Sequence, residues 1–203
     1  KPIREAWFPT DGVISMLGAA QGDDPRVEVG TIGNEGMAGL ALFLGRDRAH
    51  GECYVQVPGH ALRMSGAAFQ AAAQARPDLA RVLHRYTHAL FVQAAQGTAC
   101  NLTHSPLQRC ARWLLMTDDR VEGDSFSLKQ EFLAQMLGER RPTVSRVEST
   151  LQAQGIIAYT RGRVTVLDRK ALEETACPCY RIIRNEYDTL LQGAHGSQPT
   201  QPR

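Results

Sequence analysis

The sequence predicts an α+β fold in which a β-rich N-terminal region, one long helix and a winged helix-turn-helix follow one another. Three observations support this: short strand-like runs before residue 65, an uninterrupted helical stretch from Pro77 to about Thr103, and two helices around Gly138 that lead into a hairpin. We therefore expect a β-roll with the long dimerisation helix (about 77–103) over residues 1–104, a winged helix-turn-helix over 105–180, and a C-terminal helix with a disordered tail over 181–203.

Short apolar runs separated by turn signals predict the strands of a small roll or sandwich. The runs are Val13–Leu17, Val27–Val29, Cys53–Val57 and His60–Met64, and the turn signals include Asp11-Gly12, Gly22–Pro25 and Pro58-Gly59. A strand close to residue 5 opens the chain abruptly, which suggests that upstream strands are missing.

Two helices follow the strand-rich region. Ser65 can cap a short Ala-rich helix over 66–75, and Pro77 suits the first turn of a longer helix that reaches about Thr103. A stripe of larger residues and several small ones recur along the longer helix: Leu79, Leu83, Tyr86 and Leu90, with Ala89, Ala94, Ala95, Gly97 and Ala99. The helix can pack on its own roll or form a coiled coil with a second copy. We favour the coiled coil, because the helix is long for a domain of this size.

Serine residues predict the starts of the next two helices. Ser105-Pro106 opens a helix over Leu107–Thr117, with serine as the N-cap and proline at the first helical position. Ser127 fits a capping box with Gln130 at the start of the following helix. That helix ends at Gly138, a residue suited to the left-handed conformation just past a helix end.

Another helix follows Gly138 after three intervening residues and completes a helix-turn-helix. Pro142 opens it, and it ends near Gly155. The second helix of such a motif enters the major groove of DNA by its N-terminal end. Two β-runs, Ile156–Tyr159 and Val164–Leu167, then flank a glycine turn, which predicts the hairpin of a winged helix-turn-helix.

Basic and hydroxyl side chains gather on this motif. Residues 105–170 hold eleven Lys and Arg against eight Asp and Glu, whereas residues 1–104 hold nine of each. A local positive excess is typical of a polyanion-binding segment, and arginine can bind guanine O6 and N7 together. Solvated arginines on a small helical domain are the alternative, but they do not explain an Arg-rich helix followed by an Arg-tipped hairpin. We expect DNA contacts from Arg140, Arg141, Thr143, Ser145, Arg146 and Ser149, from Lys129 and Gln130, and from Arg161 and Arg163.

Length and composition are ordinary for a globular chain. The 203 residues are 43% hydrophobic and 22% charged, with a formal net charge of +2. No apolar run approaches the roughly 20 residues of a membrane span, and the first residues lack the layout of a secretory signal, so we expect a cytoplasmic protein. A nucleophile elbow, a phosphate-binding loop and paired catalytic carboxylates are all missing from the sequence. We therefore expect no catalytic residues, no enzyme activity and no cofactor.

The cysteines and histidines show no metal-ligand spacing. Cys53, Cys100, Cys110, Cys177 and Cys179 are scattered, and only the last two form a close pair. One intervening residue strains a disulfide, and two cysteines are too few for a four-ligand zinc site. Free structural thiols are the interpretation we favour, with redox or metal sensing as the alternative. His84 and His88 lie one helical turn apart without a third ligand, and His50, His60 and His104 have no partner suggested by spacing, so we expect no metal site.

Residues 105–170 resemble the Crp/Fnr family of bacterial transcription regulators. The resemblance lies in Arg109-Cys110-Ala111-Arg112-Trp113-Leu114-Leu115, Gln130-Glu131-Phe132-Leu133-Ala134-Gln135-Met136-Leu137-Gly138, Arg140-Arg141-Pro142-Thr143-Val144-Ser145-Arg146 and Gln154-Gly155-Ile156-Ile157. Over 1–104 only the order of elements agrees. The resemblance implies a cyclic-nucleotide-binding-like β-roll sensor, a dimerisation helix and a winged helix that binds palindromic operators. It places Arg141 and Arg146 at positions that contact bases or phosphates, and Ser145 at a position that is serine in the Fnr branch.

The sequence also departs from the family. Pro142 stands where many relatives have a glutamate that recognises cytosine, so the usual half-site is in doubt. The phosphate-loop glutamate of the cyclic-nucleotide binders falls at Gly39, and their arginine falls near Ala49-His50. Without that arginine nothing pairs with a cyclic phosphate, so we do not expect cAMP binding. Gly33–Gly36 is expected to be a turn, because its acid would repel phosphate. The N-terminal cysteine cluster of Fnr-type iron–sulfur sensing is not seen.

The resemblance implies a set of partners. We expect a homodimer on double-stranded DNA, its two recognition helices about 34–36 Å apart, with RNA polymerase as a further candidate partner and no membrane partner. A hinge near His104-Ser105 would let an effector bound to the roll reposition the DNA-binding domains. The alternative is a ligand- or redox-sensing module whose output is a protein contact rather than DNA binding.

Overall fold

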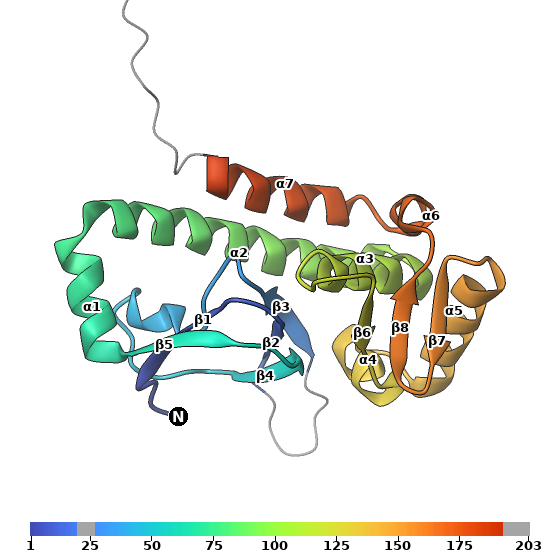
Figure 1. Cartoon of the computed structure of the whole chain (residues 1–203), viewed down its shortest axis with the longest axis horizontal. Helices are drawn as coiled ribbons and strands as arrows, with labels where there is room; N and C mark the ends of the chain where they lie inside the picture. Colours follow the sequence, from blue (N-terminus) through green and yellow to red (C-terminus); the bar gives the residue numbers. More distant parts are fainter. Residues whose placement is uncertain (20–26, 193–203) are drawn as a thin grey trace, which may run out of the picture.

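The computed structural model describes residues 1–19 and 27–192, and its N-terminal half is a β-roll. Two antiparallel sheets form it, as Figure 1 shows: β1 (Glu5–Pro9) pairs with β5 (Ala61–Ser65), and β2 (Val13–Leu17) lies between β3 (Glu28–Ile32) and β4 (Glu52–Val57). A short 3-10 helix, η1 (Leu40–Leu42), lies between β3 and β4. The turn predicted at Gly22–Pro25 and the tail predicted to be disordered after Gly193 lie outside the described residues.

Helix α1 (Gly66–Ala75) and helix α2 (Pro77–Thr103) have the predicted bounds. The Ser65 hydroxyl accepts a hydrogen bond from the Ala68 amide at 3.2 Å, which is the predicted N-cap. Helix α2 runs along the top of the roll in Figure 1. Its buried residues include Leu83, Tyr86 and Gln93, and the Tyr86 hydroxyl donates to the Met37 carbonyl of the roll. Most of the stripe in which we saw a dimer seam therefore packs on the chain's own roll.

The C-terminal half is a winged helix-turn-helix followed by two more helices. Its elements are α3 (Pro106–Asp118), β6 (Ser125–Ser127), α4 (Gln130–Leu137), α5 (Arg141–Ala153), β7 (Ile157–Thr160), β8 (Arg163–Val166), α6 (Arg169–Thr175) and α7 (Cys179–Gln192). Strand β8 lies between β6 and β7 in one antiparallel sheet. Helix α7 then returns along α2 on the side away from the roll (Figure 1). None of the described helices is long and apolar enough to cross a membrane.

One predicted helix start is wrong. Ser127 is the last residue of strand β6 and pairs with Arg163 of β8, so it cannot cap α4. The N-cap of α4 is Lys129, which makes no side-chain capping bond. The capping box lies one helix earlier, where Ser105 and Gln108 cap each other's backbone amides at the start of α3. The sequence pattern at Ser127 matched a cap, but a third wing strand already uses that serine.

A buried hydrogen bond and an aromatic contact join the roll to the C-terminal half. The Gln56 amide of β4 donates to the Thr117 hydroxyl of α3 at 2.8 Å, and the rings of Tyr54 and Phe132 lie 5.0 Å apart. These contacts involve α3 and α4. Helix α5 lies at the end of the molecule remote from the roll, as Figure 1 shows, so its outer surface is open.

Candidate nucleic-acid interface

A glycine and a buried arginine set the angle between α4 and α5. Gly138 ends α4 with φ 62° and ψ 33°, the left-handed conformation that glycine adopts at low cost. The Arg109 guanidinium of α3 donates to the Leu137 carbonyl at the end of α4, and it forms a 3.0 Å ion pair with Glu139 in the turn. Arg109 is 7% exposed, so this turn is fixed from inside the domain.

Helix α5 is amphipathic in the sense that a recognition helix requires. Val144, Val147 and Leu151 are buried against the rest of the domain. The predicted contact residues lie on its outer part: Arg140, Arg141, Arg146 and Ser149 are exposed, and Thr143 and Ser145 are half-buried. The helix starts at Arg141, with Pro142 in its first turn, and Arg140 and Arg141 are exposed at this end. This is the geometry expected of a helix that meets phosphate and base edges by its N-terminal end.

The wing is a hairpin closed by a two-residue turn. Arg161 and Gly162 have φ values of 52° and 77°, both positive, as a type I′ turn requires. Arg161 is the one residue other than glycine with positive φ among residues 1–19 and 27–192. Arg161 and Arg163 are both exposed, and the Arg163 guanidinium donates to the Ser125 hydroxyl at 3.0 Å. The Leu128 amide bonds to the Gly162 carbonyl, so the wing tip lies beside the start of α4.

The residues predicted at the start of α4 have different environments. Lys129 is exposed, whereas Gln130 is half-buried and donates to the carboxyl of Glu148 on α5 at 2.5 Å. The Ser145 hydroxyl donates to the Gln130 side-chain oxygen at 3.4 Å. Burial raises the pKa of Glu148 above its usual range. Gln130 is therefore also a support that links the two helices of the motif.

Arg141 lies in a surface ion pair. Its guanidinium is 2.9 Å from the Glu131 carboxylate, and both side chains are largely exposed. Such a pair contributes at most about 1 kcal/mol, so a phosphate can replace the carboxylate at little cost. For Arg140, Arg146 and Arg161 no side-chain partner is found within the described ranges.

Several arginines that the charge count included are not at this surface. Arg109, Arg112 and Arg120 have almost fully buried side chains, and Arg169 forms ion pairs with Asp118 and Asp119. Arg109 and Arg169 form ion pairs within the domain, and Arg120 pairs with Glu35 of the roll. Arg109 contributes to the interface only through the turn that it fixes. The sequence signal of this role was its position in the family-like run Arg109–Leu115.

The β-roll contains a cavity of about 860 Å³. Its lining is largely apolar and includes Met16, Ile32, Met37, Leu44 and Leu90. Gly39, Ala49 and His50 also line it, as does the exposed Arg48. The volume lies in the range of small-molecule sites.

Comparison with known proteins agrees with this geometry. The Crp-like helix-turn-helix domain matches residues 108–175. A comparison with curated proteins gave no match. Among solved structures, the chain is similar to the CRP-family regulator TTHB099 of Thermus thermophilus, with 22% identity, a TM-score of 0.68, and 87% of this chain and 89% of that one covered. The CRP/FNR-family regulator TTHA1359 of the same organism is 17% identical with a TM-score of 0.66, and the match covers 87% of this chain and 92% of that one. FixK2 of Bradyrhizobium japonicum is 18% identical with a TM-score of 0.64, and the match covers 87% of this chain and 89% of that one.

An exposed basic recognition helix, a wing and a matching domain family define a DNA-binding winged helix-turn-helix protein. The β-roll and the long helix complete the fold of the similar regulators. Residues 108–175 belong to the Crp-like helix-turn-helix domain family, and the chain as a whole shares the fold of regulators described as CRP or CRP/FNR family members.

Proposed function

We propose that two copies of this chain bind a palindromic operator, with α5 of each copy in the major groove and each wing on the flanking backbone. The observation that supports this most directly is the exposure of Arg140, Arg141 and Arg146 on α5, at the end of the molecule away from the roll (Figure 1). Thr143, Ser145 and Ser149 share that face. Lys129, Gln130, Arg161 and Arg163 surround it and would contact phosphates.

The proposed dimer uses a second stripe of α2, whose residues are exposed in the single chain. His84, His88, Phe91, Ala95, Thr98 and Leu102 are all exposed and follow one another at alternating steps of four and three residues. That alternation is the a/d spacing of a coiled coil. Phe91 is 70% exposed and Leu102 is 85% exposed, so a second copy would bury two large apolar side chains from each helix.

The roll is the proposed effector sensor. Its cavity has the size of a small-molecule site and an apolar lining, with Gly39 in place of a glutamate and Ala49-His50 in place of an arginine. These residues support an effector other than cAMP. Helices α2 and α3 meet at His104-Ser105, where an effector could change how the DNA-binding domain is set.

The test begins with duplexes selected from a random pool by the wild-type protein. We expect Arg146→Ala to weaken binding to the selected duplex by about 1–3 kcal/mol and to relax the preference at one base pair. Arg76→Ala is the matched control, because Arg76 is an exposed arginine at the junction of α1 and α2, the end opposite α5 (Figure 1). Fluorescence anisotropy with selected and scrambled duplexes measures both effects. An Arg146 variant that binds both duplexes as the wild type does would refute the base-contacting role.

A further inference from the structure

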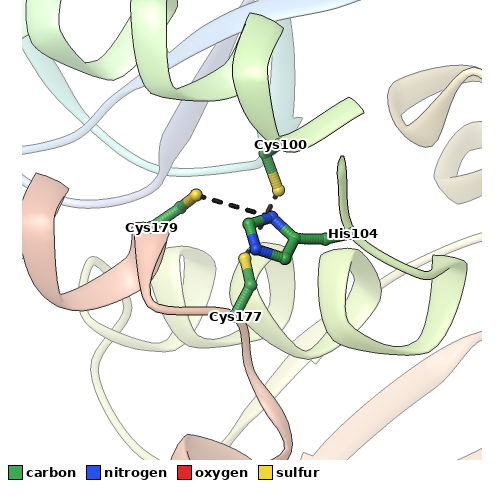
Figure 2. Close-up of side chains that lie close together, drawn as sticks. All are labelled: Cys100, His104, Cys177 and Cys179. Atoms are coloured by element: carbon green, nitrogen blue, oxygen red, sulfur yellow. Dashed lines mark hydrogen bonds between the residues drawn. The ribbon is translucent and has the colours of Figure 1, made fainter. Parts of the chain in front are cut away.

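Three cysteines and one histidine converge where α2 ends and α7 begins. Cys100 lies in the last turn of α2 and His104 follows the helix as its C-cap residue. Cys177 lies in the connection from α6 to α7, and Cys179 is the first residue of α7. Figure 2 shows the three cysteine side chains approaching the His104 imidazole from different sides. The four ligand atoms all lie within 4.8 Å of one another.

Packing alone does not account for the group. Cys100, Cys177 and Cys179 are 0–4% exposed and form a buried cluster of their own, separate from the main core. The sulfurs of Cys100 and Cys177 are 3.3 Å apart, well beyond the roughly 2.05 Å of a disulfide. The Cys179 sulfur lies 3.7 Å from the His104 Nδ1 atom. An apolar pocket has no need of an imidazole among its thiols, whereas a metal ion does.

We propose that Cys100, His104, Cys177 and Cys179 bind one Zn²⁺ ion in a closed tetrahedral structural site. Three thiolates and one imidazole are a recurring ligand set for structural zinc. Zinc–sulfur bonds of about 2.3 Å and zinc–nitrogen bonds of about 2.0–2.1 Å place tetrahedral ligand atoms roughly 3.5–3.8 Å apart. The observed separations of 3.3 and 3.7 Å are close to this range, so the ion needs only small side-chain adjustments.

Arg112 supplies the charge that such a site requires. Three thiolates and one divalent ion leave a net charge of −1, which is costly to bury without a cation. Arg112 of α3 is 8% exposed and its charge acts on all three cysteines. Its Nε atom has no hydrogen-bond partner within the described ranges, and its Nη1 atom donates to the Met116 sulfur. A buried guanidinium with so few acceptors fits beside an anionic metal–thiolate group.

The compactness of the set favours one ion over an iron–sulfur cluster. In an iron–sulfur cluster the protein ligands bind several iron atoms, so the distances between the irons place the ligand atoms further apart than around one ion. Four ligand atoms within 4.8 Å of one another leave room for a single metal. Binding is not a redox step: the three thiols release their protons to solvent as the ion enters.

The ion would fasten the start of α7 to the end of α2. Cys100 and Cys177 are 77 residues apart in the chain, and further along α7 the Tyr187 hydroxyl donates to Gln93 of α2 at 2.7 Å. The site lies next to Ser105, where α2 gives way to the DNA-binding domain. Bound zinc would therefore hold the junction between α2 and the DNA-binding domain in one arrangement.

Metal analysis of the full chain, purified under reducing conditions and dialysed against Zn²⁺, tests the proposal. We expect about one zinc per chain, the stoichiometry of a closed four-ligand site. The Cys177→Ser/Cys179→Ser variant should lose the ion, and the control Cys53→Ser, which changes an exposed cysteine outside the cluster, should keep it. Circular dichroism checks that each variant is folded. No bound zinc in folded wild type, iron with acid-labile sulfide, or zinc retained by the double variant would each overturn the proposal.

A second variant decides the question if the double serine variant does not fold. His104→Cys keeps four ligands and should still bind one ion, while the ligand-field spectrum of the Co²⁺-substituted protein should shift from that of three thiolates and one nitrogen to that of four thiolates. A Co²⁺ spectrum unchanged by His104→Cys would show that His104 is not a ligand, and the proposed site would be wrong.

Discussion

Replacement of Arg120 by methionine should destabilise the junction between the roll and the DNA-binding domain. Arg120 follows α3, and its guanidinium lies 2.8 Å from the Glu35 carboxylate of the roll, with side-chain exposures of 7% and 10%. It also donates to the Met116 carbonyl at 2.6 Å and lies over the Tyr187 ring at 5.3 Å. In the variant, the Gly33 amide, 3.2 Å away, remains as a donor to the buried carboxylate. Removal of one partner of a buried ion pair costs about 3–5 kcal/mol.

Urea unfolding followed by tryptophan fluorescence and circular dichroism measures this loss. We expect Arg120→Met to lower the free energy of unfolding by about 3–5 kcal/mol, because an unpaired buried charge is left behind. The double variant Arg120→Met/Glu35→Met should be less destabilised than Arg120→Met alone, because the charge has gone too. A solvated ion pair contributes at most about 1 kcal/mol. If Arg120→Met lowers the free energy of unfolding by less than that, the inference that this pair holds the junction is refuted.

Three further predictions concern the wing, a buried carboxyl and the dimer. Arg161→Asn keeps the type I′ turn but removes a charge, so it should weaken binding to all duplexes alike and reduce the salt slope of log K by about 1, as anisotropy at several salt concentrations would show. Burial raises the pKa of Glu28 from 4.5 to about 7, so its protonated form stabilises the fold fully below pH 4.5 and this contribution is lost as the pH rises to 7. Glu28→Gln should remove a slope of up to about 1.4 kcal/mol per pH unit in that window, measured by urea unfolding at several pH values, and an unchanged slope would contradict the assignment. Phe91→Glu should shift the proposed dimer towards monomer in light scattering, while Leu62→Glu, at a 68% exposed site on β5, should not.

Signals within a few residues of one another predicted the elements well. Ser65 and Pro77 gave the bounds of α1 and α2 as the structure has them, and Gly138 ends α4 in the expected left-handed conformation. These positions are decided by the local backbone, since a cap or a positive φ depends on one turn of chain. The wing turn at Arg161-Gly162 was found for the same reason.

Predictions that depended on which side of an element faces the core were weaker. The stripe through Leu83, Tyr86 and Leu90 matched a dimer seam in spacing, yet most of it faces the roll, while the stripe through Phe91 and Leu102 is the exposed one. Helical spacing identifies a face but does not say what covers it. Ser127 was assigned to a cap because the pairing of β6 with β8 joins residues too far apart for a local pattern to show.

Charge counting pointed to the DNA-binding segment partly for the wrong reason. Of the basic residues in 105–170, Arg109, Arg112 and Arg120 are buried, so the excess available to DNA comes from α5, the start of α4 and the wing. A sequence gives every arginine the same charge, whereas the fold divides them between internal ties and outer surface. The position of an arginine on a helix was the better guide, because Arg140 and Arg146 lie where the motif exposes its second helix.

The cysteine cluster was not predicted because its ligands lie far apart in the sequence. Spacing rules for zinc compare neighbours along the chain, and by that measure Cys177 and Cys179 were two ligands short. The other two, Cys100 and His104, lie more than 70 residues earlier and are brought alongside because α7 folds back over α2. Contacts such as that between Tyr187 and Gln93 hold that return in place. If packing between the helices assembles the ligands, zinc should add stability to a junction that already exists, and loss of zinc should loosen α7 while leaving the helix-turn-helix folded.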